Sequence, residues 1–152
     1  MGRTKPIVSK DYVVGLTDGE GCFYVNIWKS PAYRAGVGVQ MHFHVKMQEK
    51  DKALLESVRN TLDCGAVYFQ RERRQNHCQC YRYTVSAQRD ILQKVIPFFK
   101  HNPLQSASKR ENFRIFSEIA SLVERGEHLK ISGVERIKKL KAQMNKRTIG
   151  LA

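Results

Sequence analysis

Apolar and polar residues alternate along four segments of the chain, and alternation with a period of two is typical of strands that bury one face. Turn-forming residues 30–36 and charged residues 71–77 join these segments into two hairpins. In the longest segment, 37–47, the odd positions are apolar and the even positions are Gly38, Gln40, His42, His44 and Lys46. The other predicted strands are residues 22–28, 67–70 and 80–85.

Helical spacing of apolar residues predicts helices before, between and after the two hairpins. Ser9 is the expected N-cap of a short first helix, and Gly19 and Gly21 end it. Pro97 is expected to end a later helix, and residues 132–135 form the capping-box pattern of the last one. The predicted helices after the first are residues 51–62, 88–96, 107–125 and a helix from about 132 onward.

This order of elements, αββαββα, predicts an α+β domain in which a four-stranded antiparallel sheet is covered by helices on one face. Antiparallel sheets commonly leave their second face open. We expect residues 1–126 to form this core domain. Residues 127–152 are expected to form an extra basic C-terminal helix and tail, packed on the core or appended to it.

The chain has 152 residues and a formal net charge of +13, which favours a polyanionic partner, and nucleic acid above a membrane surface. No apolar run approaches the roughly 18 residues of a membrane span, and the N-terminus lacks a secretory signal. We expect an intracellular protein, in the cytoplasm or an organellar matrix or stroma, with no membrane partner. The four cysteines lack the spacing of a zinc site and are expected to be free thiols.

The open face of the predicted sheet carries hydrogen-bonding and aromatic side chains with few acids, a composition suited to reading DNA base edges. The alternative is a merely solvated sheet face. The predicted base-contacting residues are Tyr24, Asn26, Trp28, Gln40, His42, His44, Lys46, Tyr68, Gln70, Arg82 and Thr84. The turns add Ser30, Tyr33, Arg34, Arg71, Arg73 and Arg74, whose arginines would contact phosphates.

Gly15 and Gly19 lie four residues apart on one face of the first predicted helix, so two such helices could pack with their backbones nearly in contact. Each helix would then carry Glu20 just past its end. Two adjacent carboxylates are unfavourable without a cation between them, and oxygen ligands of this kind suit Mg²⁺ completed by substrate phosphate. The alternative is a tight turn with a solvated carboxylate.

Residues 13–21, VVGLTDGEG, resemble the LAGLIDADG motif of homing endonucleases, and the element order over residues 9–125 is similar to their fold. The resemblance implies that Glu20, with Gly19, binds Mg²⁺, a site that Mn²⁺ or Ca²⁺ can also occupy. It implies a homodimer, because only one motif copy is present, whose sheets form a saddle on double-stranded DNA. The implied interface residues are Val14, Gly15, Asp18 and Gly19.

The implied activity is that of an intron-encoded endonuclease that cuts a long pseudo-palindromic site and leaves short 3′ overhangs. Lys100 resembles the family's basic residue near the scissile phosphate, although it could be an ordinary surface lysine. The family's water-positioning polar residue falls at Met47, so Gln48, Lys46 or a water would take that role. The alternatives are an RNA maturase that assists intron splicing, a DNA-binding regulator that does not cleave, and an unrelated basic interaction module.

Overall fold

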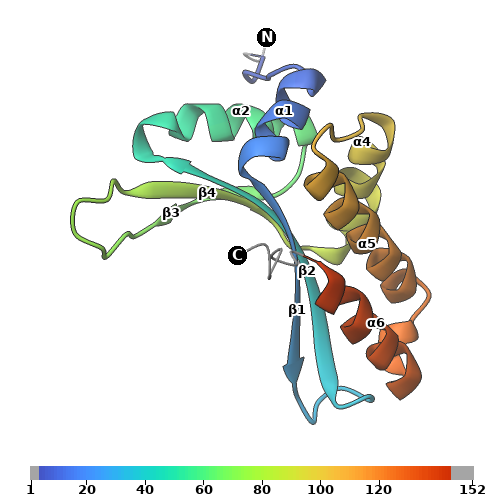
Figure 1. The fold of residues 1–152 in the computed structure, drawn as a ribbon. Helices are drawn as coiled ribbons and strands as arrows, with labels where there is room; N and C mark the ends of the chain where they lie inside the picture. Colours follow the sequence, from blue (N-terminus) through green and yellow to red (C-terminus); the bar gives the residue numbers. More distant parts are fainter. Residues whose placement is uncertain (1–3, 145–152) are drawn as a thin grey trace, which may run out of the picture.

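The computed structural model describes residues 4–144, in which four strands form one antiparallel sheet of order β1-β2-β4-β3 (Figure 1). The predicted α+β fold is confirmed. The strands are β1 (Gly21–Lys29), β2 (Val37–Gln48), β3 (Ala66–Gln70) and β4 (Cys80–Val85). The helices are α1 (Lys10–Glu20), α2 (Lys52–Leu62), α3 (Gln88–Asp90), α4 (Ile96–His101), α5 (Ala107–Glu124) and α6 (Ile131–Gln143). Two 3₁₀ turns, Glu49–Asp51 and Glu127–Leu129, and one π-helical turn, Ile91–Val95, complete the described chain.

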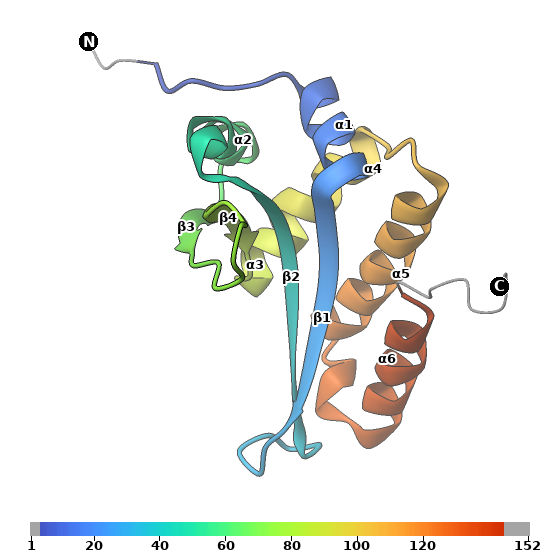
Figure 2. The ribbon, with the colours of Figure 1, turned by 60° about the vertical axis from the view of Figure 1, so that its left-hand side comes forward.

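The helices cover one face of the curved sheet and leave the other face open (Figures 1 and 2). Aromatic rings fill the space between the two layers: the Phe23 ring lies 5.2 Å from those of Phe43 and Phe116 and 5.6 Å from that of Phe99. All four side chains are buried, and for Phe23 and Phe43 this is the burial that the alternating pattern of their strands predicts. A buried ring of this size contributes about 1.5–3 kcal/mol to folding. This shared core fixes the sheet against α4 and α5.

Helix α1 begins as its sequence predicts, because Ser9 Oγ accepts a hydrogen bond from the Tyr12 N–H at 3.1 Å. It ends at Glu20, and Gly21 is already the first residue of β1. A Cβ atom added at Gly21 would lie 2.6 Å from the Thr17 side chain and 2.9 Å from its backbone, so only glycine fits there. The tight junction holds Glu20 at the point where helix and sheet meet.

The helix that precedes Pro97 does not end there as predicted. A π-helical turn over Ile91–Val95 changes the hydrogen-bonding pattern, and the Ile96 N–H donates to the Ile91 carbonyl. Pro97 then lies in the first turn of α4, directly after the π-helical turn, where a proline is tolerated. The chain therefore continues as a helix to His101.

Helix α6 packs on the core through Ile137 and Met144, which are 0% and 8% exposed. The predicted capping box is wrong, because the helix already begins at Ile131 with Lys130 as a cap that makes no side-chain hydrogen bond. Close packing replaces the cap: Gly133 lies against the backbone of Glu127. Residues 145–152 of the predicted tail lie outside the described residues.

We expect Gly133→Ala to destabilise the protein by about 1–3 kcal/mol, the usual cost of overpacking. The new Cβ would lie 1.8 Å from the Glu127 carbonyl oxygen, so α6 has to move away from the preceding turn. Urea unfolding followed by circular dichroism measures the change. The neighbouring exposed Ser132→Ala is the matched control, and equal midpoints for the two variants would contradict this packing.

No helix in the described part of the chain is long and apolar enough to cross a membrane. All four cysteines are free thiols, as predicted.

Phe69 is an apolar residue of the predicted buried face, but its side chain is 52% exposed. It lies near the end of β3, which is an edge strand of the sheet.

Candidate functional site

The strand register brings the predicted polar residues together on the open face of the sheet. Tyr24 on β1 lies opposite His42 on β2, with ring centroids 5.9 Å apart. Lys46 on β2 lies opposite Arg82 on β4, which in turn lies opposite Tyr68 on β3. The remaining predicted residues of these strands share the same parity: Asn26 pairs with Gln40, and His44 with Thr84.

The two histidines of this face are electrically neutral near pH 7. Burial, together with the positive charges of Arg82 and Lys109, lowers the pKa of His44 to about 4. Burial also lowers the pKa of His42. A neutral imidazole offers one donor and one acceptor, so both side chains can hydrogen-bond to polar base edges without adding charge.

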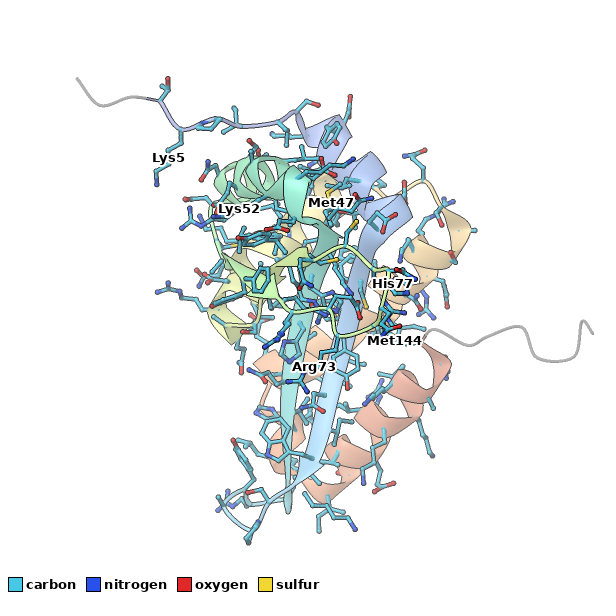
Figure 3. All side chains as sticks on the ribbon, turned by 90° about the vertical axis from the view of Figure 1, so that its left-hand side faces the viewer. Lys5, Met47, Lys52, Arg73, His77 and Met144 are labelled. Carbon is cyan, nitrogen blue, oxygen red and sulfur yellow. The ribbon has the colours of Figure 1, made fainter. Side chains whose placement is uncertain are left out.

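The loops at the two ends of the sheet extend this polar face. Between β1 and β2, Tyr33 packs edge-on against Trp28 with ring centroids 5.8 Å apart, and Arg34 is exposed. Between β3 and β4, Arg71 and Arg73 are exposed. Figure 3 views the molecule from this second loop, with Arg73 and His77 in front of the strands.

Glu20 lies exposed at the C-terminal end of α1, and within residues 4–144 its side chain has no hydrogen-bond or ion-pair partner. A cavity of about 310 Å³ adjoins it and is lined by Glu20, Lys46, Met47, Gln48, Asp51 and Cys80. The C-terminal end of a helix carries partial negative charge, which favours a cation beside this carboxylate.

The donor set at this cavity suits a hard divalent cation such as Mg²⁺, because Glu20 and Asp51 both offer carboxylate oxygens. Within residues 4–144, however, no three His, Cys, Asp or Glu side chains gather in a geometry that would hold a metal. Further ligands of a metal bound at Glu20 would therefore come from other groups, such as a backbone carbonyl, a second Glu20 or a DNA phosphate.

The predicted water-positioning residues lie around the same cavity. Gln48 is exposed and lines it. Met47 also lines it but packs against the hydrophobic core. Lys46 reaches the cavity and lies 3.9 Å from Glu72 of the β3–β4 loop. Gln48 thus remains available as a polar group beside Glu20, whereas the charge of Lys46 is partly balanced by Glu72.

Lys100 does not line the Glu20 cavity, and a different lysine contacts the residue next to Glu20. Lys100 lines a separate cavity between α4 and α5. The Lys109 ammonium instead donates a hydrogen bond to the carbonyl of Gly21, the residue after Glu20. Lys109 lies in the first turn of α5, where the helix dipole disfavours a positive charge. A lysine at this unfavourable position is a signal, readable in the sequence, that Lys109 has a role other than stabilising its helix. The motif of residues 13–21 does not include it.

Asp18 anchors the chain segment that leads to this lysine. Its carboxylate accepts hydrogen bonds from the backbone N–H groups of Gln105 and Ser106, both at 3.0 Å. These groups precede α5, whose first turn carries Lys109. Val14, another residue of the predicted interface, is 7% exposed and belongs to the hydrophobic core of its own chain.

Gly15 and Gly19 remain on the free face of α1. A Cβ atom built on either glycine would meet no atom within 4 Å, and both residues are exposed. The helix therefore presents a bare stretch of backbone to its surroundings, as the four-residue spacing of the glycines predicts.

The described residues thus combine an open polar face on a curved antiparallel sheet with an unpaired acid, Glu20, at its edge. Residues 13–120 match the sequence model of the LAGLIDADG endonucleases, and the chain belongs to this family. Its helices and sheet have the arrangement of solved homing endonucleases.

Two curated relatives are fungal proteins. The chain is 30% identical over 138 residues to the "Probable intron-encoded endonuclease 2" of Neurospora crassa, covering 91% of this chain and 29% of that protein. It is 34% identical over 102 residues to the "Probable intron-encoded DNA endonuclease 1" of Mycosarcoma maydis, covering 67% and 34% respectively. The chain thus spans about a third of the length of these relatives.

Two similar solved structures differ in chain length. The homing endonuclease I-TnaI matches with a TM-score of 0.82 and 32% identity, over 92% of this chain and 90% of that chain. The homing endonuclease I-LtrWI, bound to its target DNA, matches with a TM-score of 0.84 and 30% identity. That match covers 96% of this chain but only 46% of I-LtrWI.

Proposed function

We propose that the chain acts as a homodimeric, metal-dependent endonuclease that cleaves double-stranded DNA at a long pseudo-palindromic site and leaves short 3′ overhangs. The observation that carries the proposal is the position of Glu20, an unpaired acid where the glycine face of α1 meets the open polar face of the sheet. The names of the fungal relatives support an intron-encoded origin.

Each side chain of this site has a separate role in the proposed hydrolysis. Glu20 supplies carboxylate oxygens to a divalent cation, with Mg²⁺ the expected ion and Mn²⁺ or Ca²⁺ able to occupy the same place. A cation held there would supply Lewis-acid polarisation of the phosphodiester and a more acidic attacking water. Gln48 and Lys46 orient the attacking water at the cavity. Lys109 stabilises the negative charge that develops on the phosphate.

The open face carries the recognition surface in this proposal. Its polar and aromatic residues contact base edges in the major groove, and the arginines of the two loops contact phosphates. The similarity to I-LtrWI bound to its target DNA supports a duplex as the partner.

Two copies of the chain are required to complete the site. The chain covers most of I-TnaI but about half of I-LtrWI, so one copy corresponds to one half of the longer enzyme. Packing α1 against its counterpart through Gly15 and Gly19 would bring two Glu20 side chains together. This arrangement would supply further metal ligands.

The proposal is tested by incubating the purified protein with Mg²⁺ and a DNA library of candidate insertion sites, followed by sequencing of the ends. Discrete double-strand breaks with short 3′ overhangs are expected. Binding to DNA without breaks would replace the enzyme with a DNA-binding regulator. Selective binding to intron RNA, with no cleavage of any DNA, would replace it with a maturase.

We expect Gly15→Leu to weaken dimerisation at least tenfold while leaving the protomer folded. The new side chain extends into space that is empty in the single chain and would hold the two α1 backbones apart. Analytical ultracentrifugation measures the dissociation constant. Ser121→Leu on the exposed side of α5 is the control for added surface hydrophobicity. An unchanged dissociation constant for Gly15→Leu would place the dimer interface elsewhere.

A further inference from the structure

Glu72 is an acid in the loop between β3 and β4, beside a surface that otherwise gathers cations. Its carboxylate accepts two hydrogen bonds from the Arg74 guanidinium, at 2.9 Å each, and one from the Arg74 backbone N–H at 3.1 Å. Lys46 Nζ lies 3.9 Å from the same carboxylate. One acid therefore partly neutralises two cations, one in the loop and one at the Glu20 cavity.

The loop backbone holds Glu72 in this position. The Glu72 N–H donates to Gln79 Oε1 at 2.9 Å, and Gln79 Nε2 donates to the Glu72 carbonyl at 3.1 Å. The Gln79 carbonyl in turn accepts a hydrogen bond from the Glu49 N–H at 2.8 Å, just after β2. The Glu72 side chain is only 12% exposed, against 66% for Arg74. The acid is thus a fixed part of the loop.

The charge on Glu72 persists across the working pH range. Hydrogen bonds from the Arg74 side chain and backbone, and the nearby positive charges, lower the pKa of Glu72 to about 2. Two other loop arginines differ from Arg74, because Arg71 and Arg73 have no hydrogen-bond or ion-pair partner within residues 4–144. The loop therefore contains both free and neutralised guanidinium groups.

We propose that Glu72 is a specificity-determining residue that keeps Lys46 and Arg74 from binding DNA phosphates non-selectively. This inference rests on the proposed function as a DNA endonuclease. A phosphate that approaches either cation also approaches the Glu72 carboxylate, which is hydrogen-bonded to Arg74 and lies 3.9 Å from Lys46 Nζ. The two negative charges repel each other. Non-cognate DNA offers contacts only through its backbone, so no new interaction compensates for this repulsion.

Cognate DNA can compensate for the repulsion between Glu72 and the phosphates through a hydrogen bond from a base. A carboxylate in the major groove accepts a hydrogen bond from the amino group of cytosine, so a site with cytosine opposite the loop gives Glu72 a new partner. The exchange releases Lys46 at the cavity beside Glu20. Recognition of a base by the loop would then free the positive charge of Lys46 at the proposed catalytic site.

Glu72→Gln tests the proposal, with Glu49→Gln as the matched control. Both variants remove one negative charge near the same end of the sheet, but Glu49 is exposed and its side chain has no ion-pair partner within residues 4–144. Binding to a random-sequence duplex is measured by fluorescence anisotropy over a series of salt concentrations. Each additional phosphate contact steepens the plot of log affinity against log salt concentration by about 0.9.

We expect Glu72→Gln to bind random DNA about tenfold more tightly than wild type and with a slope steeper by about 1–2, as one or two extra contacts require. Glu49→Gln should show a smaller change in both quantities. Equal slopes for the two variants would overturn the proposal. If the wild-type protein binds no DNA at any salt concentration, the proposed function fails instead.

A second pair of variants separates charge neutralisation from a merely structural role of Glu72. Arg73→Ala removes a free guanidinium and should weaken binding to random DNA several-fold. Arg74→Ala removes a guanidinium already paired with Glu72, so its loss should be smaller in the wild type than in the Glu72→Gln background, where Arg74 is released to contact a phosphate. Equal losses from Arg74→Ala in the two backgrounds would show that Glu72 does not restrain Arg74, and would overturn the proposal.

Discussion

Replacement of Glu20 by Gln is expected to abolish DNA cleavage while DNA affinity stays close to that of the wild type. The substitution keeps the size of the side chain but removes the anionic oxygen that a divalent cation needs. Loss of several kcal/mol of transition-state stabilisation corresponds to a decrease in rate of about 10³-fold or more. Affinity is retained because the open sheet face, which carries the proposed DNA contacts, is unchanged.

Single-turnover cleavage and anisotropy binding on the same duplex measure the two effects separately. Glu124→Gln, at an exposed position at the end of α5, is the control for loss of one negative charge. The metal assignment would be wrong if Glu20→Gln cut at the wild-type rate. A loss of binding equal to the loss of cleavage would indicate a structural role for this acid.

Substitution of Lys109 by Met is expected to slow cleavage by about 10²-fold, a typical effect of removing one charge-stabilising group. Its ammonium is bonded to the Gly21 carbonyl, next to Glu20, and is held there by the hydrogen bonds between Asp18 and the chain before α5. Methionine retains the length and the apolar part of the side chain but offers no charge to the phosphate.

Lys100→Met is the matched control for this prediction. Lys100 lines a cavity between α4 and α5 that does not include Glu20, so its replacement should leave the cleavage rate within about twofold of the wild type. The reverse result, with Lys100→Met impaired and Lys109→Met active, would restore Lys100 as the basic residue at the scissile phosphate. Binding constants measured in parallel show whether either lysine acts through affinity.

The strands and their two faces were predictable because local alternation encodes them. Each side chain of β2 points to the face opposite that of its neighbours, so the pattern from Val37 to Met47 is sufficient to separate core from surface. The start of α1 was predictable for the same reason, since Ser9 caps a group only three residues away. Pro97 was misleading, because the π-helical turn that accommodates it has no comparable signature.

The candidate site was predictable where one segment carries it and not where two distant segments meet. The motif helix alone indicated Glu20 and the glycine face. Lys109 is separated from Gly21 by 88 residues, and no periodicity relates them. The hydrogen bonds that Asp18 accepts from the residues before α5 join segments equally distant in sequence, so the pattern of the motif helix gave no indication of them.

By itself, therefore, the sequence determined the order of the elements, the polar composition of the open face and the acid at the end of the motif helix. Only the tertiary structure decided which lysine lies beside that acid and which cations of the face are neutralised by Glu72. The physical reason is that periodicity and capping depend on neighbours within a few residues, whereas ion pairs and hydrogen bonds between segments depend on how the whole chain packs around one core.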